Sequence, residues 1–216
     1  LASLRLSQAR NWDEFTAGMA RHYTPGENMV YADVDGNIGW FGGALAPIRP
    51  RAGWSGLLPV PGDGSHEWDG ILPGTSLPRV LIPAKGFYAT ANEYNVPDDY
   101  ARKDMSAREW SDPNRVQRIG EVLGSARGLT VQDTVKLQYD DLSIPARDLM
   151  GLASSLSSPE AEVADALRRL KAWNHRMSAD SVAATIYEFW QYVIVARDSV
   201  LYMPAASRAT LGDLDK

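Results

Sequence analysis

Residues 28–43 read NMVYADVDGNIGWFGG, and this stretch decides how the first half of the chain folds. Apolar, β-branched and aromatic residues lie on both sides of an Asp-Gly pair, which predicts two antiparallel strands over 29–34 and 38–45. Asp35 and Gly36 form one of the pairs favoured in two-residue hairpin turns. We therefore expect a β-hairpin.

The same stretch also has oxygen-bearing side chains spaced as in calcium-binding loops. Asp33, Asp35 and Asn37 would supply the first, third and fifth positions of an EF-hand. That loop also needs glycine at its sixth position and a bidentate glutamate at its twelfth. Ile38 and Ala44 occupy those two positions, so the hairpin remains the better interpretation.

Composition and charge limit the classes of protein to which this chain can belong. The 216 residues can form one sizeable domain or two small ones, and 44% apolar with 23% charged residues is ordinary for a globular chain. A net charge of −5 gives no electrostatic reason to expect nucleic acid, and no apolar run of about eighteen residues predicts a membrane span. Cysteine is absent, which excludes disulfides and thiolate chemistry.

The predicted elements change in character along the chain. A helix is expected over 11–22, with Asn11 as its cap and Glu14 three residues later. From 28 to 95, short strand-like runs are interrupted by glycines and prolines. After residue 111 the pattern is helical. This order predicts an α+β fold with a β-rich first half and a helical second half, and no clean linker divides it into separate domains.

Four helices are predicted in the second half. Their expected starts are Asp112-Pro113, Thr130, Ser158-Pro159 and Ser178. The last helix, over about 179–200, carries apolar residues around most of its circumference, so it is expected to be largely buried.

The two ends of the chain have no features of natural termini. Leu1–Leu6 has neither an initiator methionine nor a signal-peptide pattern and enters a helical pattern at once. Residues 211–216 give no sign of a natural stop. We expect the chain to be an internal piece of a longer polypeptide.

Seven blocks of sequence occur in a fixed order between residues 28 and 190, and the resemblance that they carry covers roughly residues 8–195. They read NMVYADVDGNIG, APIRPR, LPVPGDGSHEWDG, LPRVLIPAKGFYATANEYN, PNRVQRIGEVL, VKLQYDDLSIPARDL and RMSADSVAATIYEFW. In order and spacing they resemble the penicillin acylase family.

The resemblance implies an N-terminal-nucleophile hydrolase with a four-layer αββα sandwich. Its precursor cuts itself to expose a serine, whose own α-amine then serves as the base for amide hydrolysis. Leu1 cannot be that nucleophile, and the Gly-Ser pairs at 64–65 and 124–125 lie within the part that matches the mature β chain. Residues 1–216 are therefore expected to form a single partial domain, inactive alone, whose partners are the α chain and the remainder of the β chain.

Asn92 and Arg115 are the catalytic residues that the resemblance implies. Asn92, in GFYATANEYN, matches an asparagine of the oxyanion hole; its alternative role is that of a turn residue. Asn95 lies outside the matched position. Arg115, in DPNRVQRI, matches an arginine that orients this amide or holds a substrate carboxylate. The alternative is an exposed helix arginine, as expected of Arg118.

Glu27 and Asp104 complete the candidate site. Glu27 falls at a position that contributes to the acyl pocket in some members, where a glutamate argues against a phenylacetyl substrate; otherwise it faces water. Asp104 falls where a carboxylate of a structural calcium ion would lie, and a solvated loop aspartate is the alternative. No cofactor is expected for the chemistry itself.

Two functional hypotheses remain open. The first is an acylase acting on a β-lactam side chain, an N-acyl homoserine lactone or another acylated amine, located in the periplasm or secreted, as is common in the family. The second is a catalytically inactive homologue, or a binding module on the same scaffold.

Overall fold

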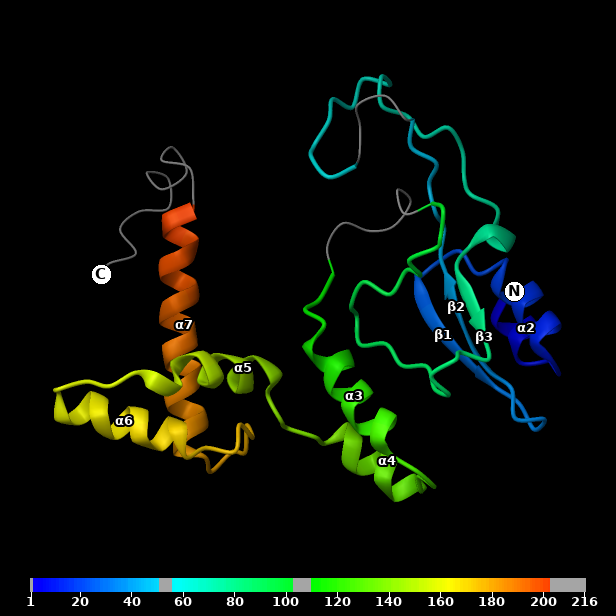
Figure 1. The fold of residues 1–216 in the computed structure, drawn as a ribbon. Coiled ribbons are helices and arrows are strands. Elements are labelled where there is room, and N and C mark those ends of the chain that lie inside the picture. Colours follow the sequence, from blue (N-terminus) through cyan, green and yellow to red (C-terminus); the bar gives the residue numbers. More distant parts are fainter. Residues whose placement is uncertain (1, 51–55, 103–109, 203–216) are drawn as a thin grey trace. The chain divides into compact units, whose positions relative to one another are not determined.

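The computed structural model describes residues 2–50, 56–102 and 110–202, with side chains described as far as residue 197. Its contacts divide the chain into two compact units, Leu1–Gly128 and Leu129–Lys216 (Figure 1), which we describe separately. The expectation of one partial domain over 1–216 stays a prediction. None of the described helices is long and apolar enough to cross a membrane.

The first unit is built on a three-stranded antiparallel sheet in the order β1-β2-β3 (Figure 1). In the register of the sheet, Trp40 pairs with Val30 on one side and with Val80 on the other. The elements of this unit are α1 (Ala2–Leu6), α2 (Trp12–Met19), β1 (Glu27–Ala32), β2 (Ile38–Gly43), η1 (Gly74–Ser76), β3 (Arg79–Leu81) and α3 (Asn114–Ser125).

Helix α2 begins as predicted. The side chain of Asn11 accepts a hydrogen bond from the backbone N–H of Glu14 at 2.9 Å, which satisfies one of the free donors of the first turn. The helix ends at Met19, three residues before the predicted end. Its last turn tightens, because the N–H groups of Arg21 and His22 donate to carbonyls three residues back.

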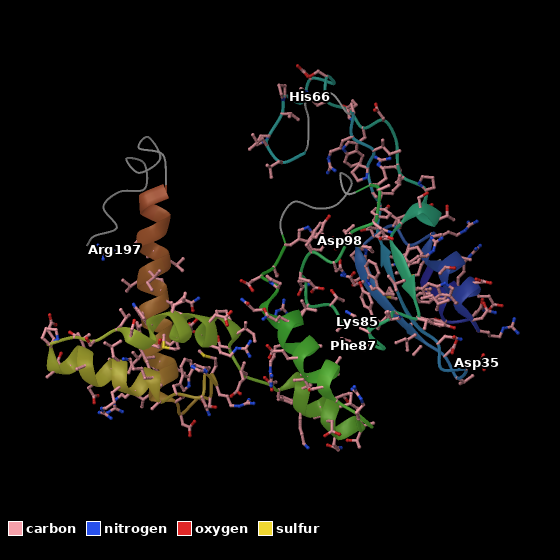
Figure 2. All side chains as sticks on the ribbon, in the orientation of Figure 1. Asp35, His66, Lys85, Phe87, Asp98 and Arg197 are labelled. Atoms are coloured by element: carbon pink, nitrogen blue, oxygen red, sulfur yellow. The ribbon has the colours of Figure 1, made fainter. Side chains whose placement is uncertain are left out.

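The predicted hairpin is confirmed, but its two-residue turn is wrong. Strand β1 ends at Ala32, and the N–H of Asp33 donates to the carbonyl of Asn37, so the turn contains three residues. The Asp33 carboxylate accepts from the backbone N–H groups of Asp35 and Asn37, which draws Asp33 into the loop. Gly36 takes the left-handed conformation (φ 85°), and Asp35 lies at the tip (Figure 2).

One face of the sheet packs on α2. Phe15 and Met19 of the helix form a buried cluster with Phe41 of β2. Gly39 lies opposite Trp12, and a Cβ at this position would be 2.6 Å from the indole ring. The glycine therefore allows the helix to approach the sheet closely.

The opposite face of the sheet receives the loop that follows β3. Trp40 is 1% exposed and stacks on Tyr88, with ring centroids 5.0 Å apart. The ammonium group of Lys85 lies 4.9 Å from the ring centroid of Phe87 and 5.2 Å from that of Tyr88 (Figure 2). The sheet thus anchors the segment that leads to Asn92.

The second unit is helical, as predicted. Thr130 caps α4 in a reciprocal capping box with Asp133. Helix α5 was not predicted, although Ser143 caps it and a proline lies in its first turn. The elements are α4 (Val131–Gln138), α5 (Ile144–Leu152), η3 (Ala153–Ser155), α6 (Ala161–Lys171) and α7 (Val182–Tyr202).

The expectation that the last helix is largely buried is wrong. Among the described side chains of α7, up to residue 197, only Ala184 and Tyr187 are buried in the core of this unit, whereas Phe189 is 71% exposed and Tyr192 is 72% exposed. The core residues lie in the first half of α7, which packs on α5 and α6, and the helix then continues past them (Figure 1). Apolar side chains around a helix are therefore buried only where another element packs on them.

Candidate active site

Asn92 lies in the loop between β3 and α3, in a left-handed backbone conformation with φ 69°. Asparagine is one of the few residues that adopt this conformation readily. Its carbonyl accepts a hydrogen bond from the N–H of Ser111 at 2.9 Å, and its side chain is exposed. The loop therefore holds the backbone of Asn92 while leaving its amide accessible.

Arg115 lies in the first turn of α3. The helix begins one residue later than predicted, and the Asp112 carboxylate accepts from the N–H of Asn114 at 2.8 Å. From this position Nη2 of Arg115 donates to the carbonyl of Ala91 at 2.6 Å and to Oδ1 of Asn92 at 2.8 Å. The structure thus brings the two predicted catalytic residues together.

This contact determines how the Asn92 amide is oriented. A guanidinium has only donors, so the amide atom facing it must be the oxygen. With Oδ1 bound to Arg115, the Nδ2 group is the part of the amide that can donate to a ligand. The expected orienting role of Arg115 is consistent with this geometry.

Arg118 differs from expectation. It was expected to be an ordinary exposed helix arginine, but its side chain is only 21% exposed and pairs with Glu121 at 3.2 Å. Arg115 is the more exposed of the two. The contact with Asn92 is made by Arg115.

A cavity of about 590 Å³ opens beside Asn92, within the first unit. Glu27, the first residue of β1, also lines it, so two of the predicted site residues share one cavity. Its wall combines polar and aromatic side chains, among them Glu27, Asn28, Trp40, Asn92, Asn95 and Trp110.

A hydrogen-bonded network forms the wall of this cavity. Oδ1 of Asn28 accepts from the indole N–H of Trp40 and from Nδ2 of Asn95, both at 2.8 Å. From the sequence, Asn95 was a nearby rival of Asn92 that falls outside the matched position, and Asn28 had no expected role. A usable signal was present, because Asn28 directly follows Glu27 and lies on the strand beside Trp40.

Burial raises the pKa of the Tyr88 hydroxyl above its ordinary value, and the negative charge of Glu93 raises it further. Tyr88 is therefore a neutral phenol at neutral pH and supports the loop through stacking on Trp40.

The loop that contains His66 also brings a serine and an aspartate together. Ser65, His66 and Asp63 meet in one loop, but the Ser65 hydroxyl contacts the Asp63 carboxylate at 2.5 Å as well as Nδ1 of His66 at 2.7 Å. In a hydrolytic triad the carboxylate instead accepts from the histidine. Asp63 also accepts from the N–H of Ser65, which is the pattern of an Asx turn.

Asp104, the predicted calcium ligand, lies outside the described residues. Among residues 2–50, 56–102 and 110–202, no group of three or more histidine, aspartate or glutamate side chains is placed to hold a metal ion. Calcium at Asp104 stays a prediction.

The first unit therefore combines the Asn92–Arg115 pair with a neighbouring cavity, and the relatives of this chain are named as acylases. The family model for penicillin amidase matches residues 1–208, so the chain belongs to that family. It is 38% identical to the penicillin acylase 2 proenzyme of a Pseudomonas species over 162 residues, covering 74% of this chain and 20% of that protein. It is 34% identical to the acyl-homoserine lactone acylase QuiP of Pseudomonas syringae pv. tomato over 178 residues, covering 76% of this chain and 21% of that protein.

A solved structure matches the fold. The thermostable penicillin G acylase from Alcaligenes faecalis superposes with a TM-score of 0.73 at 25% identity, covering 96% of this chain and 39% of that one. The predicted α+β class, as part of the N-terminal-nucleophile hydrolase sandwich, is confirmed by this match. The chain spans about a fifth of the length of the two curated relatives.

Proposed function

We propose that this chain is the part of an acylase that carries its oxyanion asparagine. The enzyme hydrolyses a linear amide through an N-terminal serine supplied by polypeptide outside these 216 residues. The observation that carries the proposal is the double contact of Arg115 with Ala91 and Asn92, which turns Nδ2 of Asn92 away from the guanidinium.

The chemistry follows from where charge develops. Attack of the serine hydroxyl on the amide carbon breaks the C=O π bond and places negative charge on the former carbonyl oxygen. A neutral amide N–H held in advance stabilises that charge without losing a proton. In this reaction Asn92 is the donor and Arg115 fixes the direction of the donation.

The cavity beside Asn92 is where the acyl group binds. Glu27 places a carboxylate on its wall, and a carboxylate next to an apolar aromatic group would lose hydration without gaining a partner. An acyl group that is polar near Glu27 therefore fits this wall better than phenylacetyl. Two relatives are named as a penicillin acylase and an acyl-homoserine lactone acylase, so acylated β-lactams and acyl-homoserine lactones are the substrate classes to test.

The remaining features of the proposal come from family membership. The precursor processes itself into an α chain and a β chain that contains these residues, in the periplasm or outside the cell. The chemistry needs no cofactor, and a structural calcium ion binds at Asp104. Support for processing is the proenzyme named among the relatives.

The test uses the full-length precursor that contains this chain. Hydrolysis is measured with the p-nitroanilides of phenylacetic, octanoic and glutaric acids and with octanoyl homoserine lactone. Asn92→Ala should lower kcat by about 100- to 1000-fold, because one oxyanion donor is removed. Asn174→Ala, a change in a loop of the second unit, is the matched control and should leave kcat unchanged.

Two outcomes contradict the proposal. If a folded, processed protein hydrolyses none of these amides, it is an inactive homologue or a binding module. If Asn92→Ala keeps full turnover while remaining folded, Asn92 is not the oxyanion donor.

A further inference from the structure

Glu93 is the one charged residue that is buried among those with described side chains, at 7% exposure. A buried carboxylate needs hydrogen-bond partners to offset its lost hydration. Its Oε2 accepts the backbone N–H of Ala91 at 2.6 Å and lies 3.5 Å from the hydroxyl of Thr90. The side chain therefore folds back onto the residues just before Asn92.

This contact completes a clamp around the Ala91–Asn92 segment. The N–H of Ala91 is held by Glu93, and the carbonyl of Ala91 is held by Arg115 at 2.6 Å. The carbonyl of Asn92 is held by the N–H of Ser111 at 2.9 Å. With these groups fixed, the φ of 69° at Asn92 is held from both sides.

The clamp is also joined to the sheet. Nδ2 of Asn95 lies 3.4 Å from the Thr90 hydroxyl, which contacts Glu93, and donates to Asn28 of β1. Asn28 in turn accepts from the indole of Trp40 in β2. A continuous series of polar contacts thus connects the rigid sheet to the loop that carries Asn92.

We propose that Glu93 is a positioning residue that aims the Asn92 amide at the oxyanion by holding the backbone N–H of Ala91. The proposal rests on the function proposed above, since it assigns a role in the same reaction. Glu93 does not touch the substrate in this scheme, and it does not line the cavity where the acyl group binds.

The carboxylate suits this role for two physical reasons. A charged acceptor forms a shorter and stronger hydrogen bond than a neutral one, as the 2.6 Å distance indicates. Its oxygen reaches back over only two residues, so the contact constrains the backbone locally. Glutamine keeps an acceptor oxygen at the same reach, whereas alanine removes it and leaves the N–H of Ala91 without this partner.

The experiment compares Glu93→Ala and Glu93→Gln in the full-length enzyme, each alone and combined with Asn92→Ala. Glu162→Gln, at an exposed site in α6, is the control for loss of a glutamate charge. kcat and KM are measured with the fastest of the four amide substrates named above. Circular dichroism and chain processing confirm that each variant folds.

Glu93→Ala should lower kcat by about 10- to 100-fold with KM changed less than about threefold, because the donor is misdirected while the acyl cavity is intact. Glu93→Gln should recover most of that loss. In the Asn92→Ala background, Glu93→Ala should cause little further loss, since no donor remains to be aimed.

Three results overturn the role of Glu93 while leaving the proposed function intact. They are full kcat in folded Glu93→Ala, no recovery in folded Glu93→Gln, and an equal loss from Glu93→Ala with and without Asn92. Failure of the proposed function looks different, because then the unsubstituted enzyme is inactive or Asn92→Ala itself has no effect.

Discussion

Nη2 of Arg115 lies 2.8 Å from Oδ1 of Asn92, although 23 positions separate the two residues in the chain. The contact joins the first turn of α3 to the loop after β3, and the same nitrogen also holds the carbonyl of Ala91. One arginine atom thus constrains both the backbone before Asn92 and its side chain.

Replacing Arg115 by lysine should therefore lower turnover in the full-length enzyme. An ammonium keeps the charge, but it lacks the planar guanidinium whose geometry supports both contacts. We expect kcat to fall by about 10- to 100-fold with a smaller change in KM. Steady-state kinetics on the p-nitroanilides measure the effect. Arg127→Lys, which changes an arginine bound to nearby carbonyls at the end of α3, is the control and should be neutral.

Equal kcat in the Arg115→Lys enzyme and the unsubstituted enzyme would show that charge alone is enough to orient Asn92.

Replacing Glu27 by leucine should improve hydrolysis of apolar acyl groups. Glu27 lines the cavity, and removing its carboxylate removes the cost of placing an apolar group beside it. We therefore expect kcat/KM for the phenylacetyl and octanoyl p-nitroanilides to rise by about tenfold. This factor corresponds to about 1.4 kcal/mol. Glu67→Leu, in an exposed loop, is the matched control. If the ratio of kcat/KM between these two apolar substrates and the p-nitroanilide of glutaric acid stays unchanged, Glu27 lies outside the acyl subsite.

Two tyrosines of α7 should differ sharply in their effect on stability. Tyr187 is 2% exposed in the core of the second unit, and Tyr192 is 72% exposed. Tyr187→Ala should lower the free energy of unfolding by about 3–5 kcal/mol, as for other large core truncations. Tyr192→Ala should change it by less than about 0.5 kcal/mol. Urea denaturation of the 216-residue chain measures both, and equal effects would contradict the observed packing.

Asp33 should make the hairpin stability depend on pH. The hydrogen bonds of Asp33, first that from the side chain of Asn37, lower the pKa of this carboxyl below 3.8. A lowered folded pKa means that the charged form stabilises the fold; the effect is complete above about pH 5 and is lost as pH falls below 3.8 through the folded pKa.

Asp33→Asn should therefore lower Tm at neutral pH, and the difference from the unsubstituted chain should shrink by about pH 3. Thermal denaturation between about pH 3 and about pH 7 measures this difference. A gap that widens toward acid pH would show that the sign is wrong. Asp35→Asn, at the exposed tip of the same turn, is the control.

The hairpin shows which structural features a sequence pattern predicts and which it does not. Apolar, β-branched and aromatic residues on both sides of Asp-Gly were enough to predict two paired strands. The length of the turn was missed, because it depends on the several donors that converge on the Asp33 carboxylate. Helix α7 shows the same limit for burial: its apolar pattern was clear, but burial depends on which elements cover it.

At the site, Asn92 and Arg115 were found through family resemblance and not through local pattern. An asparagine in a loop and an arginine in a helix are ordinary by themselves, and only the fold brings them within hydrogen-bonding distance. Glu93 was missed because a glutamate in a polar loop segment is usually exposed. Its burial results from a side chain that bonds to backbone two residues earlier.

The backbone conformation of Asn92 has a consequence for evolution at this position. With φ at 69°, glycine, asparagine and aspartate are the residues that fit with the least strain. Glycine has no side chain to donate, and an ionised aspartate can only accept. A saturation library screened for hydrolysis should thus return asparagine almost alone, whereas a library screened for folding alone should accept all three.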